Sequence, residues 1–507
     1  PSTAVLGFAL NGAPLAGDPG KKALAKSYDL LAHVADGDTD HKYTITLNPS
    51  ASTIFAGIGA SRMAEAKHLA ARTGFGASLD DLLVLAGMTY DEAVDFIVDH
   101  LLTEATQPPL PWYQSDINDN EWVYRRMLKE WWLREIIRTP SPFTERLVAF
   151  WSNHFVVNID DIEEPSVGWA WQDFLRLNVG GNLRTFVHGM CLHPAMLIYL
   201  DNRSNKKVAP PGSPSGTAKT EPSNENFGRE LLELFLIGEG KGYVETDVVA
   251  VARAFTGHNL TSTLQYEFYA DRHDTADLVI LGSAPGPFGG TKGDVYDIVD
   301  RIITTGMSNG SPRTAKQIVE KLWAEFIGTD PAANTAAVEQ LAATLYGPDD
   351  AHRWELKPLY KALLRRAEFK AGITDVSQKL LKTPLELICG FYRSLGLTPK
   401  DGHWDWKVYD SGSEDQDPLA PPNVKGWLGG ITWINAKTLL ERFGHMTNYG
   451  WELSDSLLPL SVKDGYTEVL LNIPRVLTPV PVPSWETTNP FSWMLRDLVK
   501  DLAYNIK

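Results

Sequence analysis

The sequence has 507 residues, more than one hydrophobic core normally holds, so we expect two or three packed units. Hydrophobic residues make up 43% and charged residues 22%, which excludes an intrinsically disordered chain. The formal net charge of -16 disfavours nucleic acid and anionic membranes as partners, because both repel an acidic surface.

The two cysteines, Cys191 and Cys389, are too few for a disulfide framework or a four-cysteine zinc site. Each lies in an apolar helical context, which indicates a small buried thiol. No run of about 18 apolar residues occurs, so we expect a soluble chain without a transmembrane segment. The sequence starts at Pro1 without a methionine, which indicates that a leader was removed in the organism or before expression.

The first hundred residues predict an arm followed by helices. Residues 1–58 are rich in Gly, Ala, Pro and Ser, with one alternating stretch at 42–47 that is typical of a short strand. From Ser61 onwards apolar residues recur at helical spacing. Thr89, followed by two acidic residues, predicts the start of a second helix.

The next part of the chain alternates proline-rich breaks with long helices. The prolines at 108–112 predict a linker, and helices are expected at about 120–137 and 142–157. The second carries aromatic residues at helical spacing, which indicates a core-facing side. A long loop at 202–223, rich in Pro, Gly, Ser and Lys, is typical of a lid or binding loop.

Helices are expected again at about 223–237 and 247–256, the latter ended by Gly257 in a left-handed conformation. A β excursion follows at 265–281, where two apolar segments flank a polar turn. Further helices are predicted at 312–327, 332–346, 382–395, 435–444 and 486–505.

These patterns predict a mainly α fold: a multi-helix globular protein with a small β-hairpin excursion near 265–281 and long irregular loops. We expect it to be organised as an N-terminal arm (1–58), a helical core unit (59–260), the β excursion (261–293), a second helical unit with a Trp-, Gly- and Pro-rich loop (294–447), and a C-terminal tail and helix (448–507).

The densest polar pattern runs from Asn224 to Phe235. On a helix Glu225, Arg229 and Glu233 follow one another at spacings of four, so one guanidinium can lie between two carboxylates. Asn226 and Glu230 form a neighbouring pair. Asn and Gly are poor helix formers, yet they crowd the first turn of this leucine-rich helix, which indicates selection for something other than helix propensity.

This pattern resembles the hallmark of the DUF1800 family, a bacterial family of uncharacterised function. The family block is Asn-Glu-Asn-(Phe/Tyr)-Ala-Arg-Glu-Leu-Leu-Glu, followed by Tyr-(Thr/Ser)-Glu-x-Asp-Val and Ala-Arg-Ala-x-Thr-Gly-Trp. The chain matches it at 224–235, 242–248 and 252–257. It departs from the family at Gly228, usually Ala, at Val244, usually Ser or Thr, and at His258, more often Trp.

The resemblance extends over roughly residues 60–447. The supporting blocks are His68 to Gly76, Phe150 to Phe155, Tyr199 to Asn202, Arg272 to Asp274, Ile280 to Gly282, Thr314 to Leu322, Pro421 to Asn423, Gly426 to Trp427, and Trp433 to Asn435. The resemblance implies an exported bacterial protein, secreted or periplasmic. It implies no reaction, so function must be argued from the residues.

Our first hypothesis is a hydrolase that acts on a polymer such as a glycan. Glycoside hydrolysis needs two carboxyl groups, one of them kept protonated. The candidate catalytic residues are Glu225, Glu230, Glu233, Arg229, Asp201 and Asp247. The residues expected to bind the small-molecule or polymeric substrate are Asn153, His154, Asn224, Asn226, Arg253, Arg272, His273, Trp427 and Trp433. Tryptophans beside Gly and Pro suit sugar rings, although core packing explains most tryptophans.

Two other hypotheses stay open. The sequence predicts no cofactor, but His154 and His273 with nearby carboxylates would form a divalent metal site if distant residues converged, since imidazole and carboxylate suit zinc, manganese or iron. The third hypothesis is a non-catalytic secreted binding or structural protein, in which the Asn, Arg and Glu network only fixes helix geometry. An open cleft at the network would favour an enzyme, and a closed network a scaffold.

Overall fold

The computed structural model describes residues 60–102, 121–208, 223–282 and 292–445, apart from residues 163, 277, 308, 379, 396–398, 400–403 and 443. The predicted arm at 1–58, the linker at 108–112, most of the loop at 202–223 and the final helix at 486–505 lie outside the described residues.

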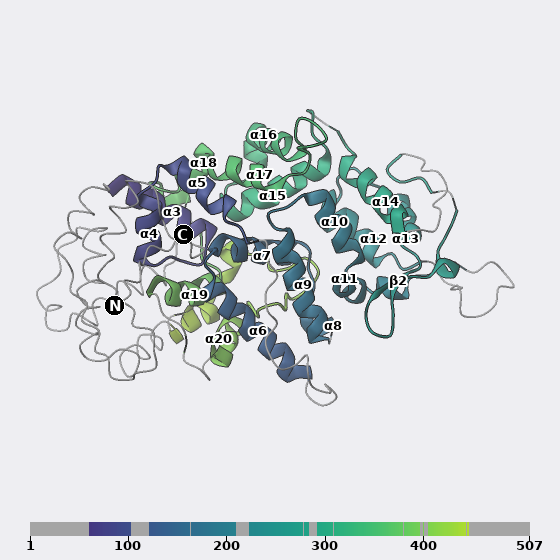
Figure 1. The fold of residues 1–507 in the computed structure, drawn as a ribbon, viewed down its shortest axis with the longest axis horizontal. Helices are drawn as coiled ribbons and strands as arrows, with labels where there is room; N and C mark the ends of the chain where they lie inside the picture. Colours follow the sequence, from purple (N-terminus) through teal and green to yellow (C-terminus); the bar gives the residue numbers. More distant parts are fainter. Residues whose placement is uncertain are drawn as a thin grey trace, which may run out of the picture.

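The described part of the chain is mainly helical, as predicted (Figure 1). The first helices are α3 (Ala60–Thr73), α4 (Leu79–Ala86), α5 (Tyr90–Asp99), α6 (Glu121–Arg138), α7 (Pro142–His154), α8 (Ile159–Ile162), α9 (Pro165–Asn178), α10 (Leu183–Leu192) and α11 (Pro194–Tyr199). The predicted start at Thr89 is confirmed, because its side chain accepts a hydrogen bond from the backbone N–H of Glu92 while the Glu92 carboxylate accepts from the backbone of Thr89.

The middle of the chain holds short elements. They are η1 (Asn202–Ser204), α12 (Asn226–Glu230), the π-helix η2 (Leu231–Leu236), α13 (Glu245–Ala254), β1 (His258–Leu260), β2 (Tyr266–Phe268) and η3 (Ala270–Arg272). Gly257 follows α13 with a φ of 80°, the left-handed conformation predicted for it. Of the two expected strands, only the first forms.

The hairpin pairs β2 with β1, an upstream strand, in antiparallel register. Residues 278–281 do not form its second strand; instead Leu278 and Ile280 are buried in the core, and the N–H of Leu281 donates to Asp247. A short apolar run fits either a strand or a buried loop, so the sequence pattern did not distinguish the two.

The remaining elements form the C-terminal part of the described chain. They are α14 (Lys292–Thr304), α15 (Arg313–Phe326), η4 (Pro331–Asn334), α16 (Thr335–Tyr346), α17 (Leu356–Leu364), α18 (Ala367–Ala371), η5 (Val376–Gln378), α19 (Pro384–Leu395), α20 (Trp404–Ser413) and η6 (Gly430–Trp433). A last helical stretch covers residues 436–445.

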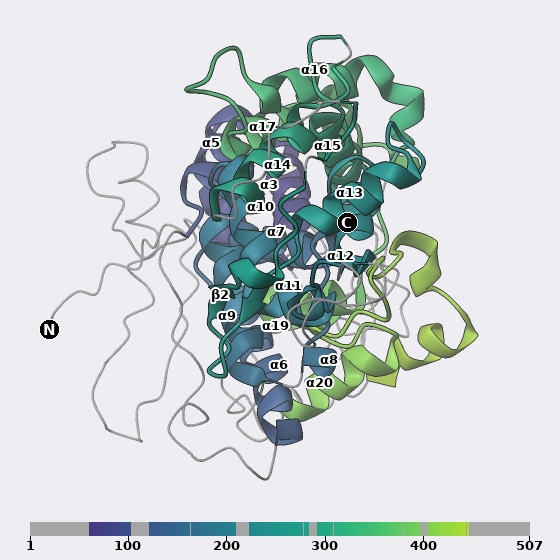
Figure 2. The same cartoon turned by 90° about the vertical axis from the view of Figure 1, so that its right-hand side faces the viewer.

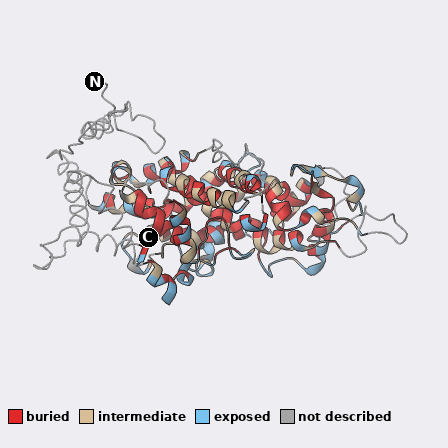
Figure 3. Cartoon of the chain, turned by 90° about the horizontal axis from the view of Figure 1, so that it is seen from below, coloured by how far each residue is buried: buried red, intermediate tan, exposed pale blue. Residues whose placement is uncertain are grey.

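The buried apolar side chains form one contiguous cluster from Met63 to Leu419. Seen from below, buried segments line the inside of an elongated helical body and exposed ones its rim (Figure 3). α3, α4 and α5 lie at one end, while α12, α13, α14 and the hairpin lie at the other (Figure 1), and Figure 2 views the body from the second end. Cys191 and Cys389 are buried free thiols, as expected. None of the described helices is long and apolar enough to cross a membrane.

The core also encloses charge. Arg176 on α9 donates from Nε and Nη2 to the two carboxylate oxygens of Glu145 on α7, at 2.6 and 2.8 Å. The side chains are 0% and 1% exposed, and the indole of Trp132 adds a third hydrogen bond to the same carboxylate. A bidentate ion pair of this kind is stable in the core only because each buried charge has an opposite charge and hydrogen-bond partners beside it.

Candidate functional site

Three segments that are far apart in the sequence meet at the predicted polar helix. They are the C-terminal end of α7, the helix formed by α12 and η2, and the loop at 421–427. Asn153 joins the first to the third: its side-chain oxygen accepts from the N–H of Trp427 at 2.7 Å, and its amide donates to the Trp427 carbonyl at 3.1 Å. His154 joins the first to the second, because its Nε2 donates to the carbonyl of Phe235 at 2.9 Å.

The predicted helix is present, but its second half is a π-helix. The N–H of Ile237 donates to the carbonyl of Leu232, five residues back, at 3.0 Å. A π turn leaves carbonyls near its end without the usual partner, and the imidazole of His154 supplies one for Phe235. Burial lowers the pKa of His154 to about 3, with the charge of Lys321 acting in the same direction, so the ring is neutral at ordinary pH.

A network of asparagines fixes the start of this helix. Asn224 donates its backbone N–H to the side chain of Asn205, and its amide to the carbonyl and carboxylate of Asp201. Asn226 donates from its backbone N–H to the Asn224 side chain and from its amide to the carbonyl of Leu200. These contacts explain why poor helix formers stand here: their short side chains bond to the backbone where the helix begins.

Asp201 and Gly228 complete this framework. Asp201 has a φ of 54°, and its exposed carboxylate accepts from Ser204 and Asn224. A Cβ atom at Gly228 would lie 2.9 Å from the backbone nitrogen of Ala252. The glycine therefore allows α12 and α13 to pack closely, which is a structural reason for a residue that helix propensity disfavours.

Arg229 is the centre of the predicted charge ladder. Its guanidinium contacts Glu225 at 3.3 Å and Glu233 at 3.1 Å, the two partners that the spacing of four predicts. A third carboxylate, Glu245 at the start of α13, accepts at 2.5 Å. The side chain of Arg229 is 33% exposed, so this cluster is at the surface rather than in the core. Hydrogen bonding to Glu245 raises the pKa of Arg229 and lowers the pKa of Glu245.

Glu230 differs from the other carboxylates of the block. It is half-buried, and no described residue gives it a hydrogen bond or an ion pair. Burial raises its pKa, and the charge of Glu233 adds to the increase, while Arg229 and Lys425 oppose it. Glu230 is therefore the carboxyl of the block that is best placed to hold a proton.

The loop at 421–427 brings a cation to this site. Lys425 forms an ion pair with Glu239 at 3.0 Å, and its charge acts on Glu230 and Glu233. Gly426 has a φ of 75°, and a Cβ atom there would lie 2.2 Å from the side-chain oxygen of Asn153. The loop can approach α7 closely only because this position has no side chain.

A model of the family described as "Protein of unknown function (DUF1800)" matches residues 68–499, most of the chain. The chain belongs to the DUF1800 family. No curated protein and no solved structure matches the chain. Among the blocks that suggested this DUF1800 assignment, those at 150–155, 224–235, 421–423 and 426–427 meet at α12 and η2. The block from His68 to Gly76 begins on α3, at the other end of the body.

Other residues predicted for the DUF1800 site lie in other surroundings. Asp247 accepts from the N–H groups of Val244 and Leu281, so it caps α13. Arg253 pairs with Asp274 at 2.7 Å, and Arg272 covers the ring of Tyr269. Each of these side chains has a structural partner.

The predicted aromatic platforms are covered. Trp427 and Trp433 are 8% and 4% exposed, so their faces pack in the protein and offer no surface for a sugar ring. The aromatic side chains beside the carboxylates are instead Tyr199 and Tyr243, both partly exposed. Burial, with the charges of Asp161 and Glu230, raises the pKa of Tyr199 to about 12.

The metal hypothesis finds no support in the described residues of this DUF1800 protein. His154 bonds to Phe235, whereas Nδ1 of His273 bonds to the carbonyl of Thr256, in a different part of the fold. Within the described ranges, no three His, Cys, Asp or Glu side chains gather in a way that could hold a metal ion.

Sequence reasoning missed Glu245, Lys425, Tyr199 and Tyr243. Tyr199, Tyr243 and Glu245 lie inside segments that carry the family resemblance, and Lys425 lies between two of them, but their residue types alone did not mark them. A small cavity of about 30 Å³ between α3, α4 and α7 lies elsewhere and is lined by Thr73, Asp81, Ser141 and mostly apolar neighbours. None of residues 224–235 lines it.

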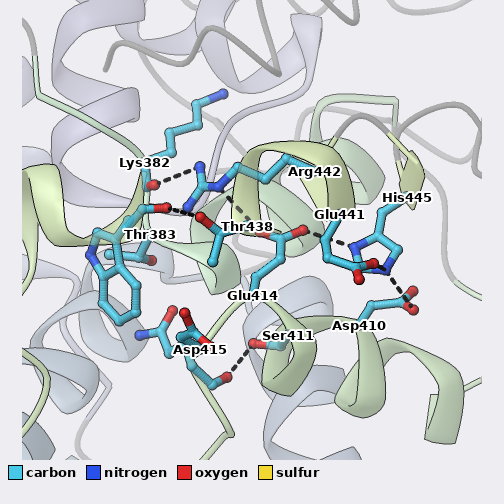
Figure 4. A network of polar contacts seen from close by, with 12 residues as sticks. Lys382, Thr383, Asp410, Ser411, Glu414, Asp415, Thr438, Glu441, Arg442 and His445 are labelled. Atoms are coloured by element: carbon cyan, nitrogen blue, oxygen red, sulfur yellow. Dashed lines mark hydrogen bonds and ion pairs between the residues drawn. The ribbon is translucent and has the colours of Figure 1, made fainter. Parts of the chain in front are cut away.

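A second charged network, also unpredicted, holds residues 436–445 against α20 (Figure 4). Arg442 and Glu414 are both fully buried and lie 3.4 Å apart. His445 contacts Glu414 through Nδ1 at 2.9 Å and Asp410 through Nε2 at 3.3 Å. Burial opposes charge on His445, but the hydrogen bond to Glu414 and the surrounding carboxylates raise its pKa above the usual value. This network fixes both ends of the segment that carries Lys425.

Proposed function

We propose that this DUF1800 protein is a hydrolase that cleaves glycosidic bonds in a polymer, with Glu230 as the general acid. The observation that carries the proposal is the state of Glu230: a half-buried carboxyl with a raised pKa, no hydrogen bond or ion pair with any described residue, and a second carboxylate, Glu233, close by. A general acid must keep its proton near the working pH and release it to the leaving group, which a paired carboxylate cannot do.

Glu233 is the proposed second carboxylate, acting as base or nucleophile. The charge of Glu233 raises the pKa of Glu230, which places the two carboxyl groups close to each other. Arg229 donates to Glu233 at 3.1 Å, which orients it and balances its charge. The pair thus has the asymmetry that glycoside hydrolysis requires, with one proton donor and one anion.

The proposed substrate is a glycan because the surroundings offer groups that bind hydroxyls and sugar rings. Asn226 is exposed, and Tyr199 and Tyr243 lie partly exposed beside the carboxylates. A polymeric substrate also fits the secreted or periplasmic location that the family resemblance implies.

The test uses leaving groups of different basicity. We expect Glu230→Gln to lower turnover of a polysaccharide by about 10²-fold or more, the usual contribution of a general acid. Turnover of a dinitrophenyl glycoside should fall far less, because that leaving group departs without a proton. Glu339→Gln on α16 serves as the control. Equal losses on both substrates would contradict an acid role for Glu230.

A scaffold is the second candidate, and the saturation of Arg229 by three carboxylates favours it. In that case the wild-type protein should release no reducing ends from any polysaccharide of a broad panel. Glu230→Gln should then leave the denaturation midpoint and the circular dichroism spectrum of the protein unchanged, since no contact would be lost.

A further inference from the structure

Two buried histidines, His258 and His273, lie side by side outside the candidate site. His258 begins β1 and His273 follows η3; they are 0% and 1% exposed. Their ring centroids are 6.0 Å apart, with the ring planes nearly perpendicular. Neither residue belongs to the charge cluster of Arg229.

One nitrogen of each ring is held in place. Nδ1 of His273 donates to the carbonyl of Thr256 at 2.7 Å, which leaves a lone pair on Nε2. Nδ1 of His258 contacts the hydroxyl of Tyr266 at 2.9 Å. A hydrogen bond of this kind, between the far nitrogen and a carbonyl or hydroxyl, fixes the tautomer of a metal-binding histidine.

The other nitrogen of each ring has no partner. Both Nε2 atoms are buried and make no hydrogen bond with any described residue. Buried polar atoms normally find partners, and two neighbouring imidazoles with the same atom unsatisfied indicate a shared ligand that would satisfy both. An imidazole binds a metal ion in its neutral form, in which the nitrogen without a proton carries a lone pair.

The surroundings select the kind of ligand. Phe268 packs against both imidazoles, at centroid distances of 4.9 and 5.2 Å, and Phe255 lies 5.9 Å from His258. These walls are apolar, and the described residues offer no third His, Cys, Asp or Glu ligand. Zinc would need four ligands, and a divalent ion would bring two charges into an apolar site.

We propose that His258 and His273 form a binding site for one Cu(I) ion. Monovalent copper accepts two imidazoles in a line and carries a single charge, so both the ligand number and the apolar walls suit it. The centroid distance of 6.0 Å matches a linear bridge, in which two metal–nitrogen bonds of about 2 Å join the ring edges. The ion would join β1 to the segment after η3.

The test measures competition for Cu(I) with bathocuproine disulfonate under ascorbate and without oxygen. The wild-type protein should withdraw one equivalent of Cu(I) from the coloured complex. His258→Trp, which installs the residue more frequent in the family, and His273→Phe should each weaken binding at least tenfold. His193→Asn is the matched control, because asparagine keeps the cap of α11 while removing an imidazole. Wild-type affinity in both variants would overturn the site, as would the absence of binding by the wild type.

X-ray absorption of the copper-loaded wild type gives a readout that does not depend on how the variants fold. The site predicts two nitrogen neighbours and no sulfur. The chain also has two cysteines and eight methionines, so sulfur neighbours would place the copper elsewhere and overturn the proposal.

Discussion

The Arg176–Glu145 pair and the Arg229 cluster use the same residue types for opposite purposes. The first is enclosed: the guanidinium of Arg176 forms two hydrogen bonds with Glu145, and the carboxylate of Asp173 lies 3.9 Å away. The second is one-third exposed, with one guanidinium among three carboxylates and a fourth, Glu230, that pairs with none of the described residues. Burial forces charges to match, whereas a surface cluster can keep an excess of carboxylate that is available for chemistry.

The largest expected effect comes from a substitution that breaks the buried pair of Arg176 and Glu145. Arg176→Met should lower the free energy of unfolding by about 3–5 kcal/mol, because Glu145 would remain as an unmatched charge in the core. Arg229→Met should change it by about 1 kcal/mol or less, since water replaces an exposed partner. Chemical denaturation measures both. The double variant Arg176→Met/Glu145→Leu should recover much of the loss; no recovery would mean that burial of charge is not the cause.

A smaller effect is expected at the loop that serves the surface cluster. Gly426→Ala should cost about 1–3 kcal/mol, because the residue has a left-handed backbone and the new Cβ would meet Asn153. Gly240, also left-handed but with open space around it, is the control, since Gly240→Ala adds strain without a clash. If thermal denaturation shows equal losses in the two variants, the contact with Asn153 is not what holds the loop.

The smallest effect is a pH dependence in the network of Figure 4. The folded-state pKa of His445 is raised, so its contribution to stability is complete below the unfolded value near 6.5 and is lost as pH rises through the folded value. Denaturation midpoints measured from pH 6 to 9 should therefore fall more steeply in the wild type than in His445→Gln. Parallel curves would show that Asp410 and Glu414 do not favour the charged imidazole.

Sequence periodicity predicted α6, α7, α15 and α16 because apolar residues recur along them at helical spacing, but it did not single out α9, α10, α14 or α17. The Arg229 ladder followed from spacing alone, since residues four apart on a helix are neighbours. The third partner, Glu245, could not be predicted this way, because it reaches Arg229 only through the packing of α13 on α12. The buried ion pairs of Glu145, Arg176 and Arg442 could not be predicted for the same reason, because their partners are distant in the chain.

Sequence periodicity could not predict the π-helix either. An α-helix and a π-helix have similar apolar patterns over six residues, and the choice between them depends on tertiary contacts such as the bond from His154 to Phe235. Similarly, Trp427 and Trp433 have Gly and Pro neighbours in the sequence, which favoured exposed rings that bind sugars. In the structure, the hydrogen bonds between Asn153 and the backbone of Trp427 hold that segment against the body.

The wide turn of η2 means that this stretch contains one residue more than an α-helix of equal rise would need. Removing one residue between Leu231 and Leu236 would restore ordinary winding and leave the two flanks in nearly the same angular relation, because the wide turn already absorbs the extra residue. The hydrogen bond from His154 to the carbonyl of Phe235 is thus where a neighbouring helix accommodates that extra residue.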